Sequence, residues 1–297
     1  MKMPAISLLE WQQRYGTEKS CAEALSKTRW PDGFMCPHCG TMKAYYVQGR
    51  NVYQCSGCRH QVSLTADTMF HSTNLPLVKW FWAIYLTASD KGGISALRLC
   101  KHIKVSWPTA RNMLRKIRIA MAHRNSLCRL DKIIEFDDTV VGGKRTGKRG
   151  RGAAGKKPVL VAVETRGEKA GIVAMEAVGS VSKETVREFI RYHVKDGQTV
   201  RTDALSALNS VNETQQHEKR VTPPEEASKW LPMVHIMIGN MKAFINGTFH
   251  GVSSQYLQEY LDEFCYRFNR RFWEDELPLR LLNACLAHSP VRLAENC

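Results

Sequence analysis

The sequence lacks any apolar run long enough to span a membrane. A bilayer-spanning helix needs about 20 consecutive apolar residues, and the most apolar stretch, residues 75–88, is interrupted by Lys79. We therefore expect no transmembrane helix. The N-terminal segment MKMPAISLLEW also lacks an apolar core of signal-peptide length. We expect no secretory leader, and hence a cytoplasmic protein whose thiols stay reduced.

Acidic residues are scarce relative to basic ones. The 28 Asp and Glu residues stand against 43 Lys and Arg residues, which gives a formal net charge of +15. The apolar content of 43% is typical of a folded protein. A foldable chain with this much unbalanced positive charge favours a polyanionic partner. We expect double-stranded DNA, with association with the nucleoid when bound, over the alternative of a membrane surface.

Four of the ten cysteines form two paired motifs. Cys36, Cys39, Cys55 and Cys58 follow a C-x2-C-x15-C-x2-C spacing, which predicts a zinc ribbon with one tetrahedral Zn²⁺. Four thiolates close the coordination shell, so we expect a structural metal with no catalytic role. The other six cysteines are scattered, which is typical of small buried apolar residues.

Helical patterns flank the ribbon. We expect a helical segment at 1–30, the zinc ribbon at 31–66 and a helical DNA-binding segment at 67–130. Within the last, a helix-turn-helix is predicted, with Ser106 as the N-cap of its second helix. The polar face of that helix carries basic residues, namely Arg111, Arg115, Lys116 and Arg118. They indicate either DNA contact, with Arg111 and Arg115 foremost, or a merely solvated face.

An α/β domain is expected at 131–272, followed by a C-terminal tail at 273–297. Strands are predicted at 132–137, 158–165, 171–178 and 199–202, with a possible fifth at 219–222. Helices are predicted at 183–194, 205–211, 233–246 and 253–270. Three strands, then a helix and a strand, then a helix and a strand, is the order of an RNase H-like fold. Such a fold is a mixed sheet with helices on both faces.

A basic segment separates the first two predicted strands. Residues 142–157 hold seven basic residues and six glycines but no acidic residue. The segment cannot supply a core, so we expect a loop. Its cations are either solubilising or bind DNA phosphates. The candidates for phosphate contact are Lys144, Arg145, Lys148, Arg149 and Arg151.

Two aspartates end predicted strands. Asp137 ends the first strand and Asp203 the fourth, and these strands are central neighbours in an RNase H-like sheet. Their carboxylates should converge, and convergent carboxylates favour Mg²⁺ or Mn²⁺. Such ions can activate a nucleophile toward a phosphodiester. The alternative for each aspartate is a turn or helix cap.

Asp138 is the competing carboxylate beside Asp137. Side chains alternate along a strand, so Glu135 and Asp137 share one face. Asp138 shares the other face with the apolar pair Ile134 and Phe136. We therefore favour Asp137.

The chain resembles bacterial insertion-sequence transposases of the ISXO-like group. The similarity lies in RWPDGFMCPHCG, IEFDDTVVGGK, TDALSAL, NMKAFINGTFHGVS and YLDEFCYRFNRR, in that order, within residues 29–271. The resemblance implies a DDE-type transposase. Such an enzyme binds the terminal inverted repeats of its element, cleaves there and joins the 3′-hydroxyl to target DNA. It also implies a homo-oligomer on DNA.

The resemblance assigns roles to individual residues. Asp137 and Asp203 match the first two catalytic positions, and the third lies seven residues before a helical lysine. That lysine is Lys242, which is expected to bind a DNA phosphate, so the third position is His235. The wider class has glutamate there, and Glu225 and Glu226 are the fallback acids. Imidazole suits softer ions than Mg²⁺, which favours Mn²⁺.

Two other functions remain open from the sequence. One is an inactive, domesticated DNA-binding descendant; a hydrophobic third position would favour it, whereas His235 can still bind metal. The other is a metal-dependent, structure-specific nuclease. The ribbon and the helix-turn-helix favour sequence-specific DNA over this second alternative.

Overall fold

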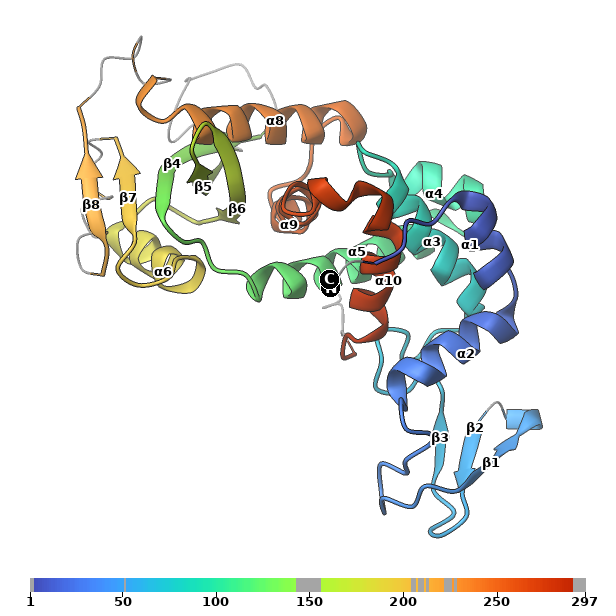
Figure 1. Ribbon diagram of the computed structural model, residues 1–297. Helices are drawn as coiled ribbons and strands as arrows, with labels where there is room; N and C mark the ends of the chain where they lie inside the picture. Colours follow the sequence, from blue (N-terminus) through green and yellow to red (C-terminus); the bar gives the residue numbers. More distant parts are fainter. Residues whose placement is uncertain are drawn as a thin grey trace. The chain divides into compact units, whose positions relative to one another are not determined.

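The computed structural model describes residues 3–50, 52–142, 156–203, 214–221 and 229–290, together with the single residues 207, 211 and 226. The chain folds into two compact units (Figure 1). The first comprises Met1–Ala120 and Trp273–Cys297, and the second comprises Met121–Phe272. Among the described residues, no helix is long and apolar enough to cross a membrane.

The zinc-ribbon segment is a small antiparallel sheet in the first unit. Its elements are β1 (Ala44–Val47), η1 (Gln48–Arg50), β2 (Val52–Cys55) and β3 (Gln61–Ser63). The strands pair in the order β1-β2-β3. The guanidinium of Arg29 donates to the carbonyls of Ser63 at 2.6 Å and Leu64 at 2.9 Å. These bonds fix the sheet to the helix that precedes it.

Helices form the rest of the first unit. They are α1 (Leu8–Tyr15), α2 (Glu18–Arg29), α3 (Leu77–Ser89), α4 (Ala96–Ile103), the N-terminal part of α5 (Trp107–Ser126), and α10 (Leu277–Leu286) after the 3-10 helix η3 (Arg271–Glu276). Capping boxes begin α1 at Ser7 and α2 at Thr17, where each side chain bonds to the backbone of the first turn. The apolar face of α3 buries Phe81 and Ile84 completely.

The C-terminal segment differs from the expected tail. Helix α10 packs against α2 and α3 within the first unit, and it buries Leu281 and Cys285 completely. Leu277, Leu281, Leu282 and Cys285 recur at helical spacing. This apolar periodicity is the signal that the sequence-based prediction overlooked.

The predicted helix-turn-helix is present as α4, a turn and α5. Helix α4 ends at Lys104, which has left-handed backbone angles (φ 51°). Ser106 accepts a bond from the amide of Thr109 at 3.3 Å, as expected of the N-cap. One expectation for the basic face of α5 is wrong. Arg118 is only 3% exposed, so it lies in the interior of the protein and cannot belong to a solvated surface.

The second unit contains a five-stranded mixed sheet in the order β6-β5-β4-β7-β8. The strands are β4 (Ile133–Val141), β5 (Lys157–Arg166), β6 (Lys169–Ala177), β7 (Thr199–Thr202) and β8 (Gln216–Lys219). The pairs β6–β5 and β5–β4 are antiparallel, whereas β4–β7 and β7–β8 are parallel. This is the RNase H-like arrangement that the sequence predicts. The fifth strand lies at 216–219 and not at 219–222, while the helix predicted at 205–211 falls mostly outside the described residues.

Helices cover both faces of this sheet (Figure 1). Helix α6 (Lys183–His193) packs on one face, around Ile134, Phe136 and Phe189. Helices α8 (Pro232–Phe249) and α9 (Leu257–Phe268) pack on the other, around Val161, Val163 and other buried apolar residues. Successive side chains of a strand point to opposite faces of the sheet. The odd-numbered residues of β4 therefore point toward α8.

Candidate metal centre and active site

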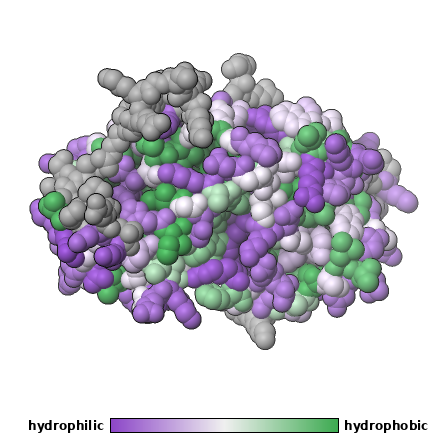
Figure 2. Space-filling view, turned by 90° about the horizontal axis from the view of Figure 1, so that it is seen from above, coloured by the Kyte–Doolittle hydropathy of each residue, from purple (hydrophilic) through white to green (hydrophobic). Residues whose placement is uncertain are grey.

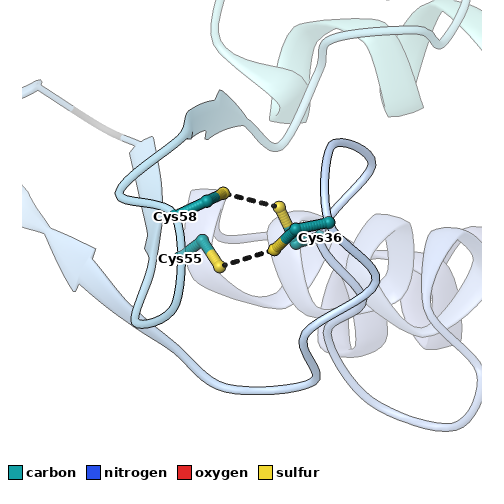
Figure 3. Close-up of side chains that lie close together, drawn as sticks. Cys36, Cys55 and Cys58 are labelled. Atoms are coloured by element: carbon teal, nitrogen blue, oxygen red, sulfur yellow. Dashed lines mark hydrogen bonds between the residues drawn. The ribbon is translucent and has the colours of Figure 1, made fainter.

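The four paired cysteines converge on one point. Their sulfurs all lie within 4.8 Å of one another. The Sγ atoms of Cys36 and Cys58 are 3.7 Å apart, and those of Cys39 and Cys55 are 3.5 Å apart (Figure 3). Sulfurs at the corners of a tetrahedron with Zn–S bonds of about 2.3 Å would be about 3.8 Å apart. The thiols could therefore hold a zinc ion with little rearrangement.

Backbone bonds shape both cysteine turns. The amide of Cys36 donates to Thr41 at 3.0 Å, and that of Cys55 donates to His60 at 2.9 Å. The amide of Gly57 donates to Cys55 Sγ at 3.3 Å. Hydrogen bonding with Thr41 lowers the pKa of the Cys39 thiol to about 6, which favours a thiolate. The turn at Cys39 thus favours the thiolate form that binds metal, whereas the pKa of the Cys58 thiol is raised to about 12 in the metal-free cluster, where the neighbouring thiols disfavour a further negative charge.

Asp137 and Asp203 lie in the second unit. Strands β4 and β7 are parallel, and their register ends with the pair Glu135 and Arg201. The expectation that Asp137 ends its strand is wrong, because β4 continues to Val141 and Asp137 lies in its middle, whereas Asp203 directly follows β7. Continued by two residues, the register sets Asp137 opposite Asp203.

Contacts identify the face of β4 that carries Asp137 as the one beneath α8. The carboxylate of Glu135 accepts a bond from the amide of Val234 in α8 at 2.9 Å. Asp137 has the same strand parity as Glu135, and its neighbour in β5 is Val161, which packs in the core under α8. Asp138 has the parity of Ile134 and Phe136, whose side chains pack on the α6 side. Asp137 and Asp138 therefore belong to opposite faces.

His235 lies beside Asp137. Its Nδ1 atom is 4.0 Å from the Asp137 Oδ2 atom, and its side chain is about one-third exposed. Lys242 follows two turns later on α8 and is half-buried. Burial lowers the pKa of Lys242, and the nearby charge of Lys156 lowers it further. Two nearby lysines make this part of the site suitable for an anionic group.

The structure brings only some of the predicted residues together. Among the described residues, the cysteines are the only group of three or more potential ligands whose atoms lie within 4.8 Å of one another. Asp137 and His235 are close, and the β4–β7 register, if continued by two residues, sets Asp203 opposite Asp137. Glu226 makes an ion pair with Arg220 at 3.6 Å. Glu225 lies outside the described residues, as do Lys144, Arg145, Lys148, Arg149 and Arg151.

The predicted DNA-contacting arginines lie on α5 in the first unit. Arg111 and Arg115 are half-buried, and the Arg111 guanidinium lies 5.9 Å from the centre of the Trp107 ring. Trp107 is 50% exposed at the start of the helix. Lys116 from the same basic face donates to the carbonyl of Met69 at 3.1 Å. Its ammonium thus bonds within the protein.

Two residues near the proposed site were missed by the sequence-based prediction. Glu135 is only 3% exposed, and burial raises its pKa. Trp230 donates from Nε1 to the carbonyl of Thr202 at 3.0 Å, directly before Asp203. For Glu135 the sequence did offer a signal, because it is an acidic residue among the apolar residues 133–136 and shares the strand face of Asp137. Nothing in the sequence pairs Trp230 with Thr202.

Weak structural similarity extends to transposase complexes. A pre-cleavage Mos1 transpososome shares 12% identity at a TM-score of 0.29, with 67% of this chain and 75% of that chain covered. A Mos1 transposase paired-end complex with the left transposon end shares 13% identity at a TM-score of 0.28, with 64% and 73% covered.

Sequence comparison identifies closer relations. The chain is 27% identical over 217 residues to an uncharacterized protein in the transposable element ISH50 of Halobacterium salinarum, covering 66% of this chain and 71% of the relative. Residues 16–61 match the transposase zinc-ribbon domain family, and residues 129–269 match the ISXO2-like transposase domain family. The first matched segment contains the four cysteines, and the second contains the five-stranded sheet. The chain therefore carries a transposase zinc-ribbon domain followed by an ISXO2-like transposase domain.

Proposed function

We propose that this protein is a DNA transposase that binds the terminal inverted repeats of its element, cleaves there, and joins the freed 3′-hydroxyl to target DNA. The observation that supports this most is the distance of 4.0 Å between His235 and Asp137, together with the parallel register of β4 and β7, which sets Asp203 opposite Asp137 when it is continued by two residues. The set offers two carboxylates and an imidazole from three separate elements. Two carboxylates and a nitrogen are a donor set that accepts Mg²⁺ and, more readily, Mn²⁺.

In this proposal Asp137, Asp203 and His235 hold the divalent cations. Ions bound there supply activation of a water or 3′-hydroxyl and stabilisation of the leaving oxygen. Lys242 binds a phosphate of the DNA near the scissile bond, with Lys156 adding positive charge beside it. Cys36, Cys39, Cys55 and Cys58 hold a zinc ion that stabilises the ribbon.

The surface around α8 suits an anionic substrate. Helix α8 contains no acidic residue, and its exposed positions are short or uncharged: Ile236, Gly239, Asn240, Ala243, Asn246 and Gly247. Figure 2 looks down on the side of the molecule where α8 lies and shows hydrophilic and hydrophobic residues interspersed. A phosphate backbone could approach this helix without meeting like charge from it.

DNA recognition is assigned to the segments outside the sheet. Arg111 and Arg115 on α5 would discriminate the terminal repeats. The cations at 144–151 would bind phosphates of any sequence and so position the DNA. We further propose that the protein assembles as a homo-oligomer on DNA, with 31–66 as the ribbon, 67–130 as the DNA-binding segment and 131–272 as the catalytic domain.

Single substitutions test the proposed site. Asp137→Ala and Asp203→Ala should each abolish cleavage of a duplex that carries a terminal repeat, while binding of the same duplex stays within a few-fold of the unmodified protein. Asp138→Ala is the matched control, because its carboxylate belongs to the opposite face of the same strand. Normal cleavage by Asp137→Ala, or loss of cleavage in Asp138→Ala alone, would refute the assignment.

A further inference from the structure

The N-terminus of α8 is capped from outside its own segment. The N-cap residue Leu231 offers no side-chain bond, and Pro232 occupies the first turn. The carboxylate of Glu135 on β4 takes this role, accepting from the amide of Val234 at 2.9 Å and from the amide of Met233. The free amides at a helix start need such acceptors when they are buried.

The burial of Glu135 is physically reasonable only in this arrangement. A buried carboxylate without partners is costly. Here it receives backbone donors and the positive end of the α8 dipole, and the charge of Arg201 acts on it as well. The bond therefore stabilises both groups, and it fixes α8 at one position along β4.

A second contact ties the start of α8 to β7. Trp230 donates to the carbonyl of Thr202 at 3.0 Å. The guanidinium groups of Arg201 and Arg220 lie 5.4 Å and 5.8 Å from the centre of its ring. Cation–π contact of this kind restricts the ring. The segment that enters α8 is thus attached to the two strands that carry Asp137 and Asp203.

We propose that Glu135 and Trp230 are positioning residues that hold His235 in register with Asp137 and Asp203. Val234 directly precedes His235, and Glu135 lies two residues before Asp137 on the same face. Thr202 directly precedes Asp203. The bond from the Val234 amide to Glu135 therefore links the residue before His235 to the strand of Asp137. The bond from Trp230 to Thr202 links the segment before α8 to the residue before Asp203. The inference rests on the proposed function, because it concerns the same three ligands.

The competing role for Glu135 is that of a direct metal ligand. The two roles differ in what they require chemically. A cap requires only an acceptor oxygen, which glutamine retains, whereas a ligand that neutralises a cation requires the negative charge. Glu135→Gln and Glu135→Ala therefore separate them.

The test measures Mn²⁺ binding to the full chain through the decrease of the electron paramagnetic resonance signal of free Mn²⁺. Amide hydrogen exchange is measured on the same variants. Glu135→Ala should weaken Mn²⁺ binding about tenfold or more, as removal of outer-shell support does. The Val234 amide should exchange about tenfold faster. In Glu135→Gln, both the Mn²⁺ affinity and the exchange rate of the Val234 amide should stay within about threefold of the values for the unmodified protein. Equal losses in Glu135→Gln and Glu135→Ala, or no loss in either, would overturn the proposal.

Control variants distinguish this inference from the proposed function. Glu164→Gln replaces another buried glutamate of the same sheet, which bonds to Arg166 and to the amide of Asp131, and should leave Mn²⁺ binding unchanged. If Asp137→Ala also binds Mn²⁺ normally, the proposed site itself fails. If Glu135→Ala does not fold, Trp230→Phe makes the comparison, because it removes the indole N–H that bonds to Thr202 while keeping a smaller aromatic ring. Unchanged Mn²⁺ affinity in folded Trp230→Phe would then overturn the inference.

Discussion

At the residue scale, the proposed ligand His235 is where the proposed site differs most from the wider DDE class. It would place an imidazole where that class has a carboxylate, so less negative charge would face the cations. We predict that His235→Ala lowers the cleavage rate less than Asp137→Ala does, and that Mn²⁺ supports cleavage by the unmodified protein at least as well as Mg²⁺. His235→Glu should keep measurable cleavage in Mg²⁺. Cleavage by His235→Ala at the full rate in both metals would remove His235 from the site.

A second residue-scale prediction concerns Asp262 on α9. Burial raises the pKa of this carboxyl to about 7, and the charges of Glu259 and Glu176 add to the effect. Between about pH 4 and pH 7 the unfolded chain releases this proton while the folded chain retains it. Asp262 therefore makes the free energy of unfolding fall as pH rises through this window, by at most about 1.4 kcal/mol per pH unit. Above pH 7 the full destabilisation from burying the charged Asp262 carboxylate is present.

Asp262→Asn should remove this dependence and raise the thermal unfolding midpoint at pH 8. Asp131 provides a control of opposite sign, because Lys195 donates to it at 2.9 Å and lowers its pKa. Its stabilisation is present at neutral pH and is lost as pH falls, so Asp131→Asn should lower the midpoint at pH 8. A lower midpoint at pH 8 for Asp262→Asn would contradict the account.

At the element scale, strand order could be predicted while several contacts could not. Alternation of apolar and acidic residues along 132–137 predicts which face of the strand Asp137 occupies, and the parallel pairing of β4 with β7 agrees with the expected neighbours. The end of the first strand was not predicted, because β4 continues past Asp137 to Val141. The burial of Arg118 could not be predicted, because a helical cation reveals its exposure only through the tertiary structure that surrounds it. The capping of α8 by Glu135 depends equally on a contact between distant segments.

The basic segment at 142–157 and helix α5 give a prediction that separates the affinity for DNA from its sequence specificity. Replacing Lys144, Arg145, Lys148, Arg149 and Arg151 by glutamine should weaken binding to any duplex and flatten its salt dependence, by roughly one unit of slope per lost phosphate contact. Arg111→Ala with Arg115→Ala should instead reduce the preference for the terminal repeat over unrelated DNA. Fluorescence anisotropy across a salt series measures both. An unchanged salt slope in the variant with five replaced cations would exclude these residues from phosphate binding.

At the scale of the whole molecule, the chain combines a four-cysteine ribbon, a helix-turn-helix and an RNase H-like sheet, and it matches transposase zinc-ribbon and ISXO2-like transposase domains. In the proposed function the ribbon and α5 would select the DNA, and the site on β4, β7 and α8 would cleave it. The central claim is that Asp137, Asp203 and His235 form one site for divalent cations.

The most direct test of that claim is anomalous X-ray diffraction from crystals of the full-length protein with terminal-repeat DNA and Mn²⁺. The account predicts an anomalous peak in contact with the carboxylates of Asp137 and Asp203 and with the His235 imidazole. The same peak should be absent in Asp137→Ala crystals grown identically. Mn²⁺ bound elsewhere in the second unit, with these three side chains uncoordinated, would contradict the account.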